Sequence, residues 1–465
     1  METQDLQAIL TETAGKLDVP GAAAAIYHDG TEHYAFHGIT SVENPLPVEE
    51  GTLFQFGSTG KTYTATAIMR LVDQGKVDLG APVRRYVPEL RLKDKQAAQD
   101  VTVLQLLNHT AGWAGDLLDD TGWGDDALEK YVGLMADIDQ VSPLGEVVSY
   151  NNASLSLAGR VIEKVTGQTF EQAMKELIFE PVGLTHSYFF TNDIMTRRFV
   201  TGHTRHQDGK VTVARPWALP RNGNPAGGIS STAGDLVKWA RFHLGDGCSA
   251  DGERVLSGEL LRLMQQPTAE SPGNAVGDAV GISWWLRDVE GVRLVSHGGN
   301  TIGQDSDFFM APQRDFAVIT LANSSPNGSE LNQELGKWAL RTCLGVEDRD
   351  PEPMQVGEAE LRPYAGRYET IAATVDIAIR DGRLVATPEI KPDVLAKLME
   401  AGEEEPDATS VILGLLPGPG DRYVVTEGPA KGMKGYFARS PSGEIAGVHL
   451  GGRLASRIGA AAMAG

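Results

Sequence analysis

A serine and a lysine three residues apart, Ser58 and Lys61, form the first pattern in the sequence that could carry out chemistry. They lie at the start of a predicted helix, where residues i and i+3 share one face, so the lysine is expected one turn from the serine hydroxyl. A serine becomes a useful nucleophile only beside a base, and a buried lysine can lose its proton and act as one. The alternative is an N-cap serine followed by an exposed lysine.

A second pattern, Tyr150-Asn151-Asn152, lies in a predicted loop just before a helix. A tyrosine can exchange protons near neutral pH only if neighbouring positive charge lowers its pKa, and Lys61 is the expected source of that charge. The amide of Asn152 has both a donor and an acceptor, so it can orient Lys61 and a substrate carbonyl. Taken alone, the pattern also fits a turn with an asparagine cap.

A third pattern, His297-Gly298-Gly299-Asn300, follows a β-like run at 292–295. Glycines in a strand let a ligand approach the backbone closely, and backbone N–H groups exposed in this way can stabilise an oxyanion. H-x-G also occurs at His28, where a hairpin turn explains it, and at His449, near the C-terminus. The copy at His297 is therefore the candidate for the site.

The elements around these patterns are strands first, helices in the middle, and strands with one helix last. Closely spaced strands with short turns favour antiparallel pairing. The predicted elements are a hairpin at 22–36, helices at 58–75, 102–108, 153–166, 232–242 and 329–344, and strands at 281–287, 292–296 and 316–322.

The composition changes near residue 346. The segment 346–360 is acidic, contains prolines and lacks apolar periodicity, which is typical of a linker. Beyond it, 361–465 alternates short β-like runs with turns, so we predict a small antiparallel β-barrel, lipocalin-like in form. The predicted division is therefore a hydrolase domain at 1–345, a linker at 346–360 and a barrel domain at 361–465.

In combination, S-x-x-K, Y-x-N and H-x-G resemble the serine β-lactamase and penicillin-binding-protein superfamily. The tyrosine of the second pattern resembles the branch of class C β-lactamases, D,D-carboxypeptidases, D-aminopeptidases and esterases. The resemblance covers about 5–345 and also includes the segments 106–112, 180–184, 226–232 and 321–323. It implies an α/β (α+β) fold: an antiparallel sheet flanked by helices, with a mostly helical insert. It implies no metal and no cofactor.

The same resemblance implies roles for the residues. Ser58 would be the acylated nucleophile, Lys61 and Tyr150 would share the role of base, and Asn152 would position the substrate. The backbone N–H groups of Ser58 and Asn300 would form the oxyanion hole. His297 would stand where the superfamily usually has a lysine.

The third pattern departs from the Lys-Thr pair that suits a substrate carboxylate. We expect His297 to present a half-charged imidazole, a feature that resembles D-aminopeptidases, D-amino-acid amidases and esterases. The segments 361–368 and 447–453 resemble the barrel extension of some cytosolic D-peptidase-like proteins. We expect the barrel to shape access rather than to supply the nucleophile, and the sequence leaves open whether it covers the cleft.

The predicted function is a serine hydrolase that cleaves amide or ester bonds, favouring D-amino-acid peptides or amides. A carboxylesterase, a promiscuous β-lactamase and a non-catalytic binding module are the alternatives. The net charge of −21 argues against a nucleic-acid partner, and two cysteines exclude a disulfide scaffold. The N-terminal residues carry no signal pattern and no long apolar run occurs, so we expect a cytoplasmic protein without membrane contact. The expected partner is a small molecule or short peptide, and a homo-oligomer is left open.

Overall fold

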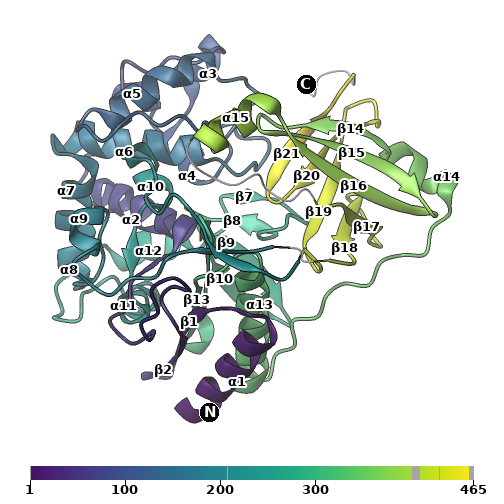
Figure 1. Cartoon of the computed structure of the whole chain (residues 1–465). Helices are drawn as coiled ribbons and strands as arrows, with labels where there is room; N and C mark the ends of the chain where they lie inside the picture. Colours follow the sequence, from purple (N-terminus) through teal and green to yellow (C-terminus); the bar gives the residue numbers. More distant parts are fainter. Residues whose placement is uncertain (1, 207, 401–408, 429, 460–465) are drawn as a thin grey trace.

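The computed structural model describes residues 2–206, 208–400, 409–428 and 430–459 (Figure 1). A large antiparallel sheet with helices on both faces makes up most of the chain, and a small closed barrel lies beside it (Figure 1). The predicted fold class, a sheet flanked by helices plus a C-terminal barrel, is confirmed. The first predicted domain begins at Met1 and the last ends with residues 460–465, and both of these ends lie outside the described residues. None of the helices within the described ranges has the length and apolar character that a membrane crossing requires.

The large sheet contains strands from both ends of the segment that precedes the barrel. Its strands are β1 (Gly21–His28), β2 (Thr31–Gly38), β7 (Ala269–Glu270), β8 (Ala279–Val280), β9 (Trp285–Val289), β10 (Val292–Ser296), β11 (Gly299–Thr301), β12 (Gln304–Ala311) and β13 (Phe316–Ala322). They follow the order β2-β1-β13-β12-β10-β9-β8-β7, with β11 also paired to β12. Every pair is antiparallel, which places β10 and β11 in succession along the same side of β12.

Several predicted strands agree with the structure. The hairpin β1–β2 turns at Asp29 and Gly30, and β10 and β13 have the predicted bounds. The prediction of a strand at 281–287 was wrong at its start, because Ser283 has a φ of 56° and the chain turns there before β9 begins. Strand β12 was not predicted, since its first half, Gln304 to Asp307, is polar.

Helices cover the two faces of this sheet. On one face lie α1 (Thr3–Lys16) and α13 (Asn327–Ala339), whose apolar side chains pack against alternate residues of β1 such as Ala24 and Ile26. On the other face lie α2 (Gly60–Asp73) and α11 (Ala233–Leu244), in a core that includes Ala25. Because helices bury both faces, β1 is an apolar run rather than an alternating strand.

A mostly helical insert stands between the first and last strands of the sheet. Its helices include α3 (Lys95–Asp100), α4 (Val103–Leu107), α5 (Ala127–Leu134), α6 (Asn152–Thr166), α7 (Phe170–Met174), α10 (Asn224–Gly227) and α12 (Gly258–Met264). The capping box predicted at Thr102 and Gln105 opens α4. Helix α6 begins after Asn151, whose side chain accepts a hydrogen bond from Ser154 N, and it ends at Gly167 as predicted.

The C-terminal part of the chain forms a closed antiparallel barrel. Its strands are β14 (Gly366–Glu369), β15 (Ala373–Arg380), β16 (Arg383–Ile390), β17 (Val411–Leu415), β18 (Arg422–Val425), β19 (Lys434–Arg439), β20 (Ile445–Leu450) and β21 (Arg453–Arg457). The ring closes between β14 and β21. Buried Tyr368, Tyr423 and Phe437 fill its interior. Helix α15 (Pro392–Glu400) lies on the side of the barrel that faces the helical insert (Figure 1).

Candidate active site

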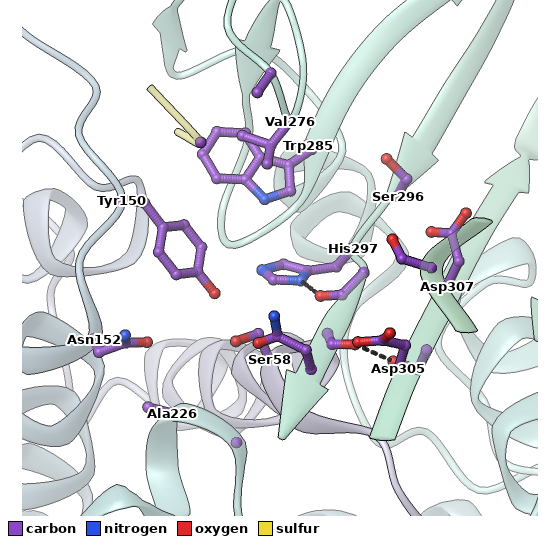
Figure 2. Close-up of a pocket in the computed structure, with 18 of the residues that line it drawn as sticks. Ser58, Tyr150, Asn152, Ala226, Val276, Trp285, Ser296, His297, Asp305 and Asp307 are labelled. Atoms are coloured by element: carbon purple, nitrogen blue, oxygen red, sulfur yellow. Dashed lines mark hydrogen bonds between the residues drawn. The ribbon is translucent and has the colours of Figure 1, made fainter. Parts of the chain in front are cut away.

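A cleft of about 1320 Å³ brings the predicted site residues together. Its lining includes Ser58, Tyr150, Asn152, His297 and Asn300, which come from the start of α2, the insert and the β10–β11 edge of the sheet. Figure 2 shows Ser58, the hydroxyl of Tyr150 and the ring of His297 turned toward one another. Arg453, at the start of β21, also lines the cleft, so the barrel forms part of its wall.

Ser58 and Lys61 have the geometry of a nucleophile and its base. A short 3-10 turn at Gly57–Thr59 leads into α2 and places Lys61 Nζ 2.9 Å from Ser58 Oγ. The lysine is fully buried and also donates to the carbonyl of Ala226 at 2.6 Å. Burial, and then the charge of Arg453, lower the pKa of Lys61 well below its ordinary value. A lower pKa favours the neutral amine, which is the form of lysine that can accept a proton from a serine hydroxyl.

The backbone of β11 lies directly against the turn that contains Ser58. A Cβ atom added at Gly299 would stand 2.5 Å from Ser58 N, and one added at Gly57 would stand 2.8 Å from Asn300 N. Only glycine fits at either position, and Gly57 also has a φ of 55°. This close approach brings the segments that carry the two predicted oxyanion donors, Ser58 N and Asn300 N, into backbone contact.

Two basic side chains lie close to the ring of Tyr150. Lys61 Nζ is 4.8 Å and the guanidinium carbon of Arg453 is 4.9 Å from the centroid of its ring. Burial nevertheless raises the pKa of Tyr150, although the Ser58 hydroxyl and Arg453 act in the opposite direction. The expectation that positive charge lowers this pKa was wrong, because desolvation of a buried phenolate outweighs the attraction. The phenol of Tyr150 is therefore protonated at neutral pH.

Asn152 is the first residue of α6, and its side chain has an unexpected partner. Its Nδ2 donates to Asp116 Oδ1 at 2.8 Å. We expected Asn152 to orient Lys61. Among the described residues, however, Asn152 Nδ2 bonds to Asp116, and Lys61 Nζ bonds to Ser58 and Ala226. The nearby carboxylate binds the amide because a charged acceptor forms a stronger hydrogen bond than a neutral one.

His297 is buried at the end of β10. Its Nδ1 lies 2.6 Å from the carbonyl oxygen of Gly298, which can only accept, so Nδ1 carries the proton (Figure 2). Its Nε2 is buried without a partner among the described residues. Burial, with a contribution from Lys61, lowers the pKa of His297 to about 3. The predicted half-charged imidazole was wrong: the ring is neutral, because no carboxylate compensates for its desolvation.

The sequence did not reveal three further members of the site. Asp116 accepts from Asn152, and Arg453 forms a two-point ion pair with Asp116 at 2.5 and 3.0 Å. The ring of His109 contacts that of Tyr150 in a tilted arrangement, with centroids 4.7 Å apart, and its Nδ1 accepts a hydrogen bond from Asn151 N. The signal for Arg453 was the double glycine before it, Gly451-Gly452, which forms a tight turn at the tip of a hairpin. Nothing local marks Asp116.

The site contains no arrangement that suggests a metal centre. Across the described ranges, no group of three or more histidine, cysteine, aspartate or glutamate side chains is placed to hold an ion. Two carboxylates, Asp305 in the lining of the cleft and Asp116 hydrogen-bonded to Asn152, differ in environment. Asp116 is paired with Arg453, whereas Asp305 Oδ2 is buried without a partner and burial raises its pKa to about 7.

Comparison with known proteins gives a family match over most of the chain. The Beta-lactamase family model matches residues 6–340. A curated relative, penicillin-binding protein 4 of Amycolatopsis lactamdurans, is 35% identical over 358 residues, which are 76% of this chain and 93% of the relative.

Two solved structures resemble the whole chain, barrel included. The crystal structure of SurE has a TM-score of 0.75 at 23% identity and covers 98% of this chain and 99% of its own. The octameric penicillin-binding protein homologue from Pyrococcus abyssi has a TM-score of 0.65 at 22% identity, with coverage of 98% and 99%. At such identities these likenesses concern the fold, and they show that the sheet, the insert and the barrel occur together in other proteins.

Proposed function

The chain belongs to the Beta-lactamase family of serine hydrolases, and we propose that it cleaves amide or ester bonds through an acyl-enzyme on Ser58. The observation that carries the proposal is the pair formed by Ser58 Oγ and the fully buried Lys61 Nζ, 2.9 Å apart in a large cleft. An exposed lysine would be protonated at neutral pH and could not act as a base. Burial of Lys61 lowers its pKa and so favours the neutral amine that the proposed reaction needs.

In the proposed reaction, Lys61 accepts the hydroxyl proton as Ser58 Oγ attacks the substrate carbonyl carbon. The electrons of the C=O double bond move to its oxygen, where the N–H groups of Ser58 and Asn300 stabilise the charge. The bond to the leaving amine or alcohol then breaks, and that group takes a proton from Tyr150, which regains one from Lys61. A water molecule repeats the sequence at the acyl carbon and releases the acid and free Ser58.

We propose D-amino-acid peptides, amides or related esters as substrates. A neutral His297 offers no positive charge at the position where the superfamily usually presents a lysine, so a substrate carboxylate gains little there. SurE, which has the same overall fold, has also been crystallised with D-Leu. A substrate that has no carboxylate beside its reacting amide or ester bond is therefore the best match to this cleft.

A hydrolysis panel tests the proposal. Full-length wild type and Ser58→Ala are compared on D- and L-aminoacyl p-nitroanilides, neutral p-nitrophenyl esters and nitrocefin. We expect turnover of D-aminoacyl anilides and esters by the wild type and none by the variant. Preference for L-aminoacyl anilides would contradict the stereochemical part, and preference for nitrocefin would identify a β-lactamase. Equal turnover by Ser58→Ala would refute the acyl-enzyme on Ser58.

Assembly and location stay predictions. The Pyrococcus abyssi homologue is described as octameric, and light scattering after size exclusion tests whether this chain also forms a homo-oligomer. A cytoplasmic site of action is the expectation from the sequence, and fractionation of the native organism tests it.

A further inference from the structure

The tip of the β20–β21 hairpin contacts the loop that carries Tyr150. Gly452 O accepts a hydrogen bond from Tyr150 N at 2.8 Å, and Leu454 N donates to Ser149 Oγ at 3.2 Å. Within β20, His449 Nε2 lies 2.7 Å from Val148 O. These contacts fix the barrel in register with 148–150, so the residue at the hairpin tip is held at a defined point of the cleft.

That residue is Arg453, and a chain of hydrogen bonds connects it to Asn152. Its Nε and Nη2 donate to the two oxygens of Asp116 at 2.5 and 3.0 Å. Asp116 Oδ1 accepts at the same time from Asn152 Nδ2 at 2.8 Å. The side chain of Asp116 is only 14% exposed, so this carboxylate has little water to replace either partner. A two-point arginine–carboxylate pair restricts orientation as well as distance.

We propose that Arg453 is a positioning residue of the active site: through Asp116 it fixes the amide of Asn152, and it places a positive charge on the ring of Tyr150, within about 10 Å of the Lys61 amine. The inference rests on the proposed function, because it assigns Arg453 a part in acylation of Ser58. The barrel then contributes to the reaction itself, although it supplies neither the nucleophile nor the base.

The distances support an electrostatic effect on Lys61. Lys61 Nζ and the Arg453 guanidinium lie 4.8 and 4.9 Å from the same ring centroid. They are thus at most about 10 Å apart, where an effective dielectric of about 20 makes their repulsion worth roughly one pKa unit. Asp116 acts in the opposite direction on Lys61. The charged and titratable groups that face Lys61 are Tyr150, Asp116, His109, His297 and Arg453.

The competing explanation is that the ion pair only fastens the barrel to the rest of the protein. Both explanations predict slower acylation when the pair is broken, but they differ in whether the two single variants shift the pKa of Lys61 in opposite directions. If the pair only fastens the barrel, Arg453→Ala and Asp116→Asn should have the same effect. If charge beside Lys61 matters, removal of Arg453 makes Lys61 easier to protonate, whereas neutralising Asp116 makes it harder.

The test measures the rate of Ser58 acylation against pH in the full-length protein, with a neutral p-nitrophenyl ester as the probe. The variants are Arg453→Ala, Arg453→Lys, Asp116→Asn and the double variant Arg453→Ala/Asp116→Asn. Lys397→Ala is the matched control, because Lys397 also joins the barrel to the hydrolase part, by an ion pair with Asp119 at 2.9 Å. Thermal melting shows whether each variant is folded.

We expect the acidic limb of the acylation profile to move up by about one pH unit in Arg453→Ala and down in Asp116→Asn. It should lie near the wild-type position in Arg453→Lys, in the double variant and in Lys397→Ala. Below the limb, Arg453→Ala should lose about tenfold in acylation rate, because one unit of pKa is a factor of ten.

The inference would be overturned if the acidic limbs of Arg453→Ala and Asp116→Asn moved in the same direction. It would also be overturned if the acidic limb of folded Arg453→Ala coincided with that of the wild type, or if neither protein showed an acidic limb. These outcomes leave the proposed function intact as long as mass spectrometry finds the wild-type acyl group on Ser58. Absence of that adduct from the wild type would instead refute the proposed function itself.

Discussion

The preference of the cleft for uncharged over anionic substrates should not change between about pH 5 and pH 8, since His297 stays neutral over that range. An imidazole with the ordinary pKa of about 6.5 would become charged as the pH falls through that value. A charged hydrogen bond from it to a substrate carboxylate is worth ~1.5–3 kcal/mol, or roughly 10- to 150-fold in affinity. With a pKa of about 3, His297 provides none of this gain.

Replacement of His297 by lysine should add the missing charge. The burial that is the largest cause of the low pKa of the histidine also acts on a new ammonium at this position. We therefore expect His297→Lys to raise the relative kcat/KM for a carboxylate-bearing substrate by about tenfold, near the lower end of that range. His297→Gln is the matched neutral control and should leave the ratio near that of the wild type.

The assay compares kcat/KM for nitrocefin with that for a neutral p-nitrophenyl ester across the same pH range, in wild type and both variants. Titration of Lys61 affects both substrates equally, so the ratio isolates the effect at position 297. A wild-type ratio that rises tenfold or more toward low pH would show that His297 becomes charged, and the reasoning from its burial would be refuted. An unchanged ratio in folded His297→Lys would show that this position does not contact the substrate carboxylate.

Three further predictions concern other residues. A fluorophosphonate should add one adduct to the wild type and none to Ser58→Ala, as seen by intact-protein mass spectrometry; an equal adduct on the variant would contradict the assignment. His109→Leu should lower the melting temperature and the acylation rate together, because it leaves Asn151 N without its acceptor, a loss of ~1–3 kcal/mol; an unchanged acylation rate would exclude a role in holding Tyr150. Asp305 has a folded-state pKa of about 7, so the folded state binds its proton more tightly and stability should fall as the pH rises from about 4 to 7. Asp305→Asn should remove that fall, measured by urea unfolding at the two ends of the range, and an equal fall in both proteins would contradict the shifted pKa.

The parts of the site that the sequence predicted are those set by local geometry. Ser58 and Lys61 meet because a helix places residues three apart on one face, and the helix forms where its apolar spacing and closing Gly75 predict it. The hairpin of β1 and β2 follows from a two-residue turn with positive φ at Asp29 and Gly30. In each case the determining interactions lie within a few residues, so one segment suffices to predict them.

The parts that the sequence did not predict depend on contacts between distant segments. Asp116 and Arg453 are separated by hundreds of positions and meet only because the barrel docks beside the insert. The protonation states of Tyr150 and His297 depend on how completely other elements bury them, and burial reversed the expectation for the first and removed the charge expected for the second. A motif specifies the types of side chain at a site, whereas their pKa values are a property of the whole fold.

The docking of the barrel and the protonation of Lys61 are connected through Tyr150. Burial is the largest cause of the low pKa of Lys61, and Tyr150 is one of the groups that cover it, with the amine 4.8 Å from its ring. The position of Tyr150 depends in turn on Gly452 O, which accepts a hydrogen bond from its backbone N–H, and on the ring of His109, which is tilted against its own ring. It follows that a displaced barrel would admit water to Lys61 and favour its protonated form, which cannot accept the proton of Ser58.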